Sequence, residues 1–233
     1  MPEQPVFVTN YQSQDGATVR RLRLGVGAMG FLLPIVLPVG NSLTSARITL
    51  LASMSASYYT PMRNVFVGGL CAIGVFLICY RHDRREDRLS SVAGVLAILV
   101  ALFPTEPPAS VTAHPTTAQT VVGTLHLCFA AGLFGVLAYF CLRLFADSRT
   151  SDGHRPAADW AYLVCGWVIV ACVVVVAVGA LLHLTWDSPL TLMYVGESVS
   201  VFAFGVAWLV KSEAVAAGLT PRRGPGPAPA VEL

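Results

Sequence analysis

The sequence is poor in charge, and this scarcity excludes several classes of protein. Only 12% of the 233 residues are Asp, Glu, Lys or Arg, whereas a soluble domain carries about 25%. The net charge of +2 is small, and the basic residues are not gathered in one patch, which excludes nucleic-acid binding. Together with a mean hydropathy of +0.66, this composition predicts a membrane protein.

Motifs that carry chemistry are also scarce. The six cysteines form no CxxC pair, which excludes a zinc ribbon or a disulfide framework. The single lysine, Lys211, stands at the end of an apolar block, which argues against a retinal site. There is no nucleophile motif, no aspartate-rich diphosphate motif and no HxxxH pair. We therefore expect no cofactor and no metal.

One apparent nucleotide motif has a different interpretation. GVGAMG at 25–30 fits the G-x-G-x-x-G pattern, but a dinucleotide fold needs a strand before it and an acidic residue about 20 residues later. These glycines instead lie inside an apolar block. Small residues in membrane helices let a neighbouring helix approach closely, and we expect that role here.

Long apolar blocks are what the sequence does have. Six of them have the length of about 17–25 residues that a membrane-spanning helix needs. They lie near 22–40, 62–80, 89–105, 119–144, 160–183 and 191–211. The fold class predicted is all-α, a polytopic transmembrane bundle of six spans. Residues 1–21 form an N-terminal arm, 22–212 the transmembrane domain, and 213–233 a Pro/Gly/Ala-rich disordered tail.

The basic residues predict the orientation of these spans. Thirteen of the 15 flank alternate ends of the blocks, namely Arg20, Arg21, Arg23, Arg81, Arg84, Arg85, Arg88, Arg143, Arg149, Arg155, Lys211, Arg222 and Arg223. Only Arg47 and Arg63 lie on the other side. Because cationic loops stay cytoplasmic, we expect both termini inside and three loops outside a multi-pass protein of the cell membrane.

Two ionisable residues lie within predicted spans, His126 and Glu197. Such residues are costly in a membrane and usually functional. Each lies six or seven residues from the outer end of its span, about 10 Å deep at a rise of about 1.5 Å per residue. We predict that they meet, as a candidate catalytic pair or as an interhelical hydrogen bond. The inner half of the bundle shows nothing comparable.

Further polar residues are expected at the outer side. The candidate ligand-binding residues are Tyr58, Tyr59, Arg63, Asn64, His183 and Asp187. Arg63 and the tyrosines can also be interfacial anchors. His126, His183, Asp187 and Glu197 are suitable metal ligands by type, but no short ligand motif joins them.

Several of these segments resemble a known group of membrane proteins. They are the tyrosine-containing loop that runs into PMRNVF, the histidine in TLHLCFAAGLFGVLAY and the glutamate in GESVSVFAFGVAWLVK. In this the chain resembles the six-span DRAM/Frag/Sfk-type proteins, and more closely bacterial six-span families without an assigned function. Their loop reads more like P-x-I-S-D, where this chain has SASYYTP. The resemblance covers about 22–212 and implies a lipid or lipid-like partner.

Three functions remain open at this point. The first is a lipid-handling or lipid-responsive protein with a polar site in the outer half of the bundle. The second is an intramembrane acid/base enzyme of hydrolase or cyclase type, acting on a lipid, a prenyl substrate or another amphipathic small molecule, with His126 as base or Glu197 as acid. A transporter ranks last, because no internal repeat is visible. No feature of the sequence indicates an oligomeric state.

Overall fold

The computed structural model describes residues 6–45, 51–81, 84–146, 157–182 and 191–218. Within these ranges the chain is helical and contains no strand. The six long helices are α1 (Val6–Ser45), α2 (Arg63–Cys79), α3 (Arg84–Leu102), α4 (Thr117–Tyr139), α5 (Ala157–Leu181) and α6 (Leu192–Gly218). A short 3-10 helix, η1 (Ser55–Tyr59), precedes α2, and a π-helix, η2 (Phe140–Phe145), continues α4.

The helices lie where the apolar blocks predict them, so the all-helical fold class is confirmed. Two boundaries differ from the expected ones. The arm 1–21 is not separate from the first block, because α1 begins at Val6 and runs through both. The residues 213–218 at the start of the predicted disordered tail are helical, and 219–233 lie outside the described residues. Once a helix is nucleated, each added residue gains a hydrogen bond, and the Ala-rich continuation of α6 favours helix.

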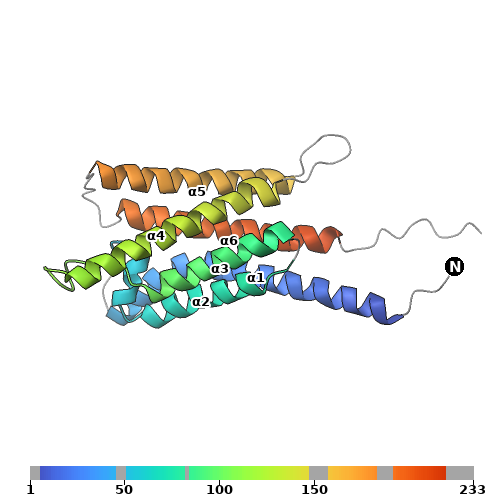
Figure 1. Cartoon of the computed structure of the whole chain (residues 1–233), viewed down its shortest axis with the longest axis horizontal. Helices are drawn as coiled ribbons and strands as arrows, with labels where there is room; N and C mark the ends of the chain where they lie inside the picture. The colour runs from blue at the N-terminus through green and yellow to red at the C-terminus, as the bar shows by residue number, and fades with distance from the viewer. Residues whose placement is uncertain (1–5, 46–50, 82–83, 147–156, 183–190, 219–233) are drawn as a thin grey trace, which may run out of the picture.

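The six helices form one elongated bundle along a common axis (Figure 1). The most extensive packing joins α1 to α6, α2 to α3, and α5 to α6, while α4 packs on α3 and α5. The first turns of α1 extend past the other helices at the right of Figure 1. Helix α4 begins with a capping box, in which Thr116 Oγ accepts from the Gln119 amide and Gln119 Oε1 accepts from the Thr116 amide at 2.8 Å.

Four helices are long and apolar enough to cross a membrane: α1, α4 with η2, α5 and α6. Helix α2 is apolar after its first two residues but has only 17 residues. Helix α3 begins with the polar run 84–88 before its apolar part. The outer surface bears large apolar side chains, such as Trp160, Trp167 and Leu181 at 61%, 63% and 78% exposure. A hydrocarbon environment suits such a surface, so the helices indicate a membrane protein.

Glycines bring the helix backbones into contact. A Cβ added to Gly205 on α6 would lie 2.5 Å from the backbone nitrogen of Phe31 on α1, and Gly30 faces Gly205 in return. A Cβ on Gly94 of α3 would lie 2.5 Å from the carbonyl oxygen of Gly74 on α2. The expected close approach of a helix to GVGAMG is therefore confirmed: Gly27 and Gly30 face α6, and Gly25 faces the Phe76 ring of α2.

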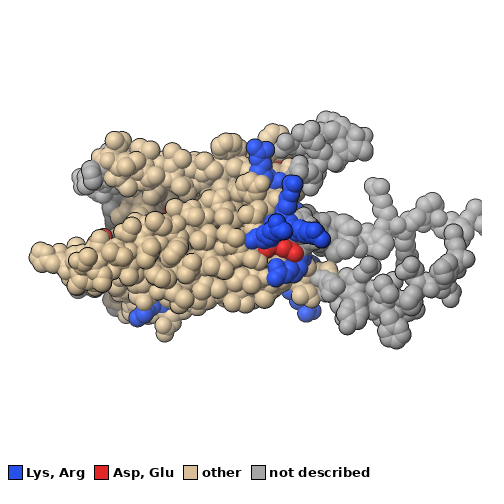
Figure 2. All heavy atoms as spheres, in the orientation of Figure 1, with Lys and Arg blue, Asp and Glu red and all other residues tan. Residues whose placement is uncertain are grey.

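Basic side chains gather at one end of the bundle (Figure 2). The exposed arginines there are Arg20, Arg21, Arg81, Arg84, Arg85, Arg88 and Arg143. We call this the arginine-rich end. The opposite end, which we call the η1 end, carries η1, the start of α2 and the segment that follows α3.

The α1–α6 contact predicts a large effect of a small substitution. Gly205→Ala should lower the melting temperature in detergent, because the new methyl group meets the backbone of α1 rather than a movable side chain. Overpacking of about 1–3 kcal/mol corresponds to a loss of roughly 2–10 °C in a chain of this size. Gly135→Ala on α4 is the control, since nothing lies within 4 Å of its Cβ position. Equal melting temperatures for the two variants would contradict the close contact.

Candidate functional site

Most of the predicted site residues lie together at the η1 end. Tyr58 and Tyr59 belong to η1, and Arg63 and Asn64 begin α2. His126 and Glu197 lie in α4 and α6, close to the same end. The remaining two candidates, His183 and Asp187, fall outside the described residues.

Glu197 holds η1 against α6. Its Oε2 accepts hydrogen bonds from the backbone amides of Met54 at 2.6 Å and Ser55 at 3.2 Å. Its Oε1 accepts from the Ser55 hydroxyl at 3.1 Å. These amides open the N-terminus of η1, where a carboxylate satisfies donors that the helix itself leaves without partners. Glu197 therefore acts as a cap for η1, and both of its oxygens are engaged.

Two more hydrogen bonds fix the position of η1. The Tyr59 hydroxyl donates to the carbonyl oxygen of Thr105, after α3, at 2.7 Å. Burial raises the pKa of Tyr59, which keeps this phenol protonated as a donor. The Thr191 hydroxyl, just before α6, donates to the carbonyl oxygen of Ala52. The segment is thus attached on both sides, to α6 and to the chain that leaves α3.

His126 does not meet Glu197, so the predicted pairing is wrong. The imidazole is 1% exposed, and its Nδ1 lies 2.6 Å from the carbonyl oxygen of Phe103. A carbonyl can only accept, so Nδ1 carries a proton, and in the neutral ring Nε2 then keeps its lone pair. Nε2 has no partner among the described residues. The helices that carry these two residues are not neighbours, because α4 packs on α3 and α5 and makes little contact with α6.

Arg63 is an exposed cation at the η1 end, where the carboxylate of Glu106 is exposed as well. Its Nη2 donates to the Tyr58 hydroxyl at 2.6 Å, and the guanidinium carbon lies 4.2 Å from the centre of the Tyr58 ring. In the described part of the chain, no carboxylate lies within ion-pair distance of it. Tyr58 thus orients the guanidinium, and among the described residues no other hydrogen-bond partner of the group is found.

A groove of about 400 Å³ begins at Asn64, the residue that follows Arg63. It runs along the outer surface between α1 and α2 and is almost wholly apolar. Its lining includes Met29, Leu33, Val36, Asn64, Val65 and Gly68. Gly68 contributes to the opening, because its Cβ position meets nothing within 4 Å. The η1 end therefore offers an exposed cation next to an apolar groove.

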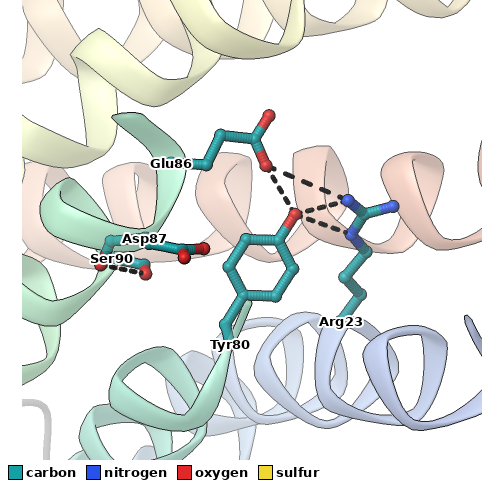
Figure 3. A network of polar contacts seen from close by, with 5 residues as sticks. All are labelled: Arg23, Tyr80, Glu86, Asp87 and Ser90. Carbon is teal, nitrogen blue, oxygen red and sulfur yellow. Dashed lines mark hydrogen bonds and ion pairs between the residues drawn. The ribbon is translucent and has the colours of Figure 1, made fainter. Parts of the chain in front are cut away.

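The arginine-rich end contains a buried polar network that the sequence analysis did not anticipate (Figure 3). Arg23 is fully buried, and its Nε and Nη2 donate to the Tyr80 hydroxyl, with Nε at 3.1 Å. That hydroxyl donates in turn to Glu86 Oε2 at 2.6 Å. Arg23 Nη2 also lies 3.9 Å from the same carboxylate oxygen. The expectation that the inner half holds nothing comparable is therefore wrong.

The sequence contained a weak signal for this network. Arg23 stands inside an apolar block, and Glu86 follows four basic residues in RHDRRED. A run of mixed charges such as this one usually forms an exposed turn, yet Glu86 is only 3% exposed. Acidic residues among arginines, together with an arginine inside a neighbouring apolar block, are the pattern that could have indicated the ion pair.

The described residues contain no group of three His, Cys, Asp or Glu side chains that could hold a metal ion. Of the four ligands considered for a metal, His126 and Glu197 have separate partners. His183 and Asp187 lie outside the described residues. The geometry thus gives no support to a metal centre at this end.

The cap on η1 predicts a local effect of substitution at Glu197. Glu197→Leu should increase amide hydrogen exchange at Met54 and Ser55, because two backbone donors lose their acceptor. Leaving a buried donor without an acceptor costs about 1–3 kcal/mol. Glu197→Gln retains one acceptor oxygen and should have a smaller effect. Ser198→Ala is a control on the same helix turn, since Ser198 makes no hydrogen bond to η1 among the described residues. Exchange at Met54 that does not change in Glu197→Leu would contradict the cap.

The network at the arginine-rich end predicts that the Tyr80 hydroxyl contributes to the stability of the whole bundle. Tyr80→Phe removes the hydroxyl that joins Arg23 to Glu86, and leaves buried charged groups underpaired. The protein should lose about 1–3 kcal/mol of stability, measured as a lower melting temperature in detergent. Tyr139→Phe changes the same chemical group on a side chain that is 48% exposed, and should have little effect. Similar losses in both variants would argue against the network.

Comparison with known proteins assigns no family to this chain. No family model matches it, and neither a curated protein nor a solved structure does. The function must therefore be argued from the residues of the chain.

Proposed function

We propose that this protein binds an anionic lipid at its surface, with the headgroup at Arg63 and an acyl chain in the groove between α1 and α2. One observation carries the proposal: the Arg63 guanidinium is exposed, lies on the Tyr58 ring and has no carboxylate partner among the described residues, and the next residue, Asn64, lines an apolar groove. The resemblance to families associated with lipids points in the same direction.

The headgroup part of the proposal rests on the state of Arg63. A guanidinium has five N–H donors in a fixed plane and binds phosphate in a bidentate manner. Only one bond to Tyr58 is formed within the described chain, and the ring beneath holds the group in place. Because the guanidinium is already ordered, binding a phosphate costs less conformational entropy. Asn64 adds an amide at the edge of the groove.

The acyl-chain part rests on the shape and chemistry of the groove. Helix α1 contributes positions from Met29 to Val36, which span about 10 Å along the axis at a rise of about 1.5 Å per residue. The groove starts at Asn64, next to Arg63, and continues toward the middle of the bundle as α2 proceeds to Gly69. In this arrangement the apolar lining would hold the acyl chain, and the cation near the end of the groove would bind the headgroup that follows the chain in a lipid.

The placement in a membrane belongs to the same proposal. All six helices would cross the bilayer, with both termini cytoplasmic and the η1 end outside. The seven exposed arginines at the other end support this orientation through the preference of cationic loops for the cytoplasm. The 17 residues of α2 reach the lower limit for a span. The lipid would then be a component of the outer leaflet of the cell membrane.

An acid/base enzyme acting on a lipid or prenyl substrate is the alternative from the sequence. Its candidate acid, Glu197, has both oxygens in hydrogen bonds to η1. Its candidate base, His126, has a free lone pair on Nε2 but is 1% exposed. This geometry supports the enzyme less well than the binding protein. Turnover of a lipid by the purified protein, lost in His126→Gln, would favour it.

Two substitutions separate the two parts of the lipid site. Purified protein in detergent is titrated with phosphatidylglycerol and with phosphatidylcholine, and binding is followed by native mass spectrometry. Arg63→Gln should weaken phosphatidylglycerol binding about 10- to 100-fold, the equivalent of roughly 1.5–3 kcal/mol for charged hydrogen bonds, and leave phosphatidylcholine nearly unchanged. Gly68→Leu should weaken both lipids, because the new side chain fills open space in the groove.

Each substitution has a matched control. Arg143→Gln removes an exposed arginine from the opposite end, and Gly135→Leu adds the same side chain at another glycine with open space around it. Both controls should bind like the wild type. If Arg63→Gln and Arg143→Gln had equal effects on phosphatidylglycerol, binding would reflect overall charge, and the proposed headgroup site would be wrong.

A further inference from the structure

A series of turn hydrogen bonds joins Glu197 to the backbone of Arg63. Glu197 Oε2 accepts from the Met54 amide at 2.6 Å. From Met54 onward, each third residue donates its amide to the carbonyl oxygen of the one before it. These bonds run from Ser57 to Met54 at 3.1 Å, from Thr60 to Ser57 at 3.1 Å and from Arg63 to Thr60 at 3.0 Å. The start of α2 is therefore tied through η1 to a side chain of α6.

A second connection runs through side chains. Tyr58 belongs to η1, and its hydroxyl accepts from Arg63 Nη2 at 2.6 Å while its ring lies 4.2 Å from the guanidinium carbon. The Tyr58 ring packs edge-on against Tyr59, with 5.4 Å between the centroids. Tyr59 is bonded in turn to the carbonyl oxygen of Thr105. Both the backbone and the guanidinium of Arg63 are thus positioned by η1.

The position of η1 itself depends on its anchors. A 3-10 helix of five residues has too few hydrogen bonds of its own to be stable in isolation. Among the anchoring bonds described above, Glu197 accepts three, whereas the hydroxyls of Tyr59 and Thr191 donate one each. Removing the carboxylate should therefore loosen η1, and with it the group that orients Arg63.

We propose that Glu197 is a positioning residue for the lipid site: through η1 and Tyr58 it holds the Arg63 guanidinium in the orientation that receives the headgroup phosphate. This role rests on the lipid site proposed above, and Glu197 itself does not touch the lipid. A guanidinium that is ordered before binding loses less conformational entropy when the phosphate arrives. Supporting contacts of this kind determine how precisely a binding group is placed.

The sign of a substitution effect separates positioning from simple electrostatics. Loss of a negative charge near Arg63 would by charge alone strengthen the binding of an anionic lipid. Glu197→Leu should instead weaken phosphatidylglycerol binding about 2- to 10-fold, the cost of ordering one free side chain, and leave phosphatidylcholine nearly unchanged in native mass spectrometry. Glu197→Gln, which keeps an acceptor for the two amides, should recover most of the loss. A folded Glu197→Leu variant with wild-type or tighter binding would overturn the proposal.

Glu106→Leu is the matched control for this measurement. Glu106 is an exposed carboxylate at the same end, and it accepts from the Thr120 hydroxyl on α4 at 3.0 Å rather than from η1. Its substitution should not weaken phosphatidylglycerol binding. An equal loss in Glu106→Leu and Glu197→Leu would overturn the specific role of Glu197.

A double substitution tests whether Glu197 acts through Arg63. In the Arg63→Gln background, Glu197→Leu should cause no further loss of phosphatidylglycerol binding, because the group that it positions is gone. Additive losses would overturn the proposed route. If Arg63→Gln alone left phosphatidylglycerol binding unchanged, the lipid site itself would be wrong. If Arg63→Gln weakened binding and Glu197→Leu did not, only the positioning role would be wrong.

The unsubstituted protein offers a test that does not depend on the folding of a Glu197 variant. Coupling between two sites is reciprocal, so phosphatidylglycerol bound at Arg63 should stabilise η1. Amide exchange at Met54 and Ser55 should slow by about the same 2- to 10-fold on addition of this lipid, and should not respond in Arg63→Gln. Saturation with phosphatidylglycerol that left exchange at these two amides unchanged would overturn the proposal.

Discussion

The bundle depends on the pairing of one buried charge. Arg23 is enclosed by protein, and an unpaired ion in such surroundings is far costlier than any single apolar contact can offset. Tyr80 at the end of α2 and Glu86 in the first turn of α3 supply its partners. Because these two residues flank the turn between α2 and α3, their bonds to Arg23 attach that hairpin to α1. The aromatic rings around Trp208 continue the same contact to η2 and α6.

Between the two ends, the helices meet through small residues. Gly205 on α6 brings its backbone against Gly30 and Phe31 on α1, and Gly74 does the same with Gly94. In a membrane, association depends on such close packing, because lipid tails are as apolar as the side chains. The buried ionisable groups, in contrast, lie toward the two ends of the bundle. At the η1 end, Glu197 and His126 are engaged within the protein, whereas Arg63 faces outward, so a partner is expected at the surface.

The sequence predicted the helices well because their signal is local. Each apolar block is long enough to be recognised as a helix without knowledge of its neighbours, and the glycines of GVGAMG indicated a close helix contact. The sequence predicted the partners of the polar residues poorly. Depth along a helix follows from residue counting, but His126 and Glu197 also needed adjacent helices, and α4 packs on α3 and α5. The bond of Glu197 to Met54 and Ser55 depended on a 3-10 turn in a polar loop without a periodic pattern. Arg23 and Glu86, more than 60 residues apart in sequence number, met only through the fold.

The proposed function requires a lipid in the groove between α1 and α2, with its headgroup at Arg63. A crystal grown in a lipidic mesophase with phosphatidylglycerol that carries bromine on its acyl chain shows directly whether such a lipid is there. Bromine anomalous peaks are expected within the groove near Leu33 and Gly68, with phosphate density beside the Arg63 guanidinium. Bromine peaks confined to other surfaces of the bundle, with an empty groove, would contradict the proposed function.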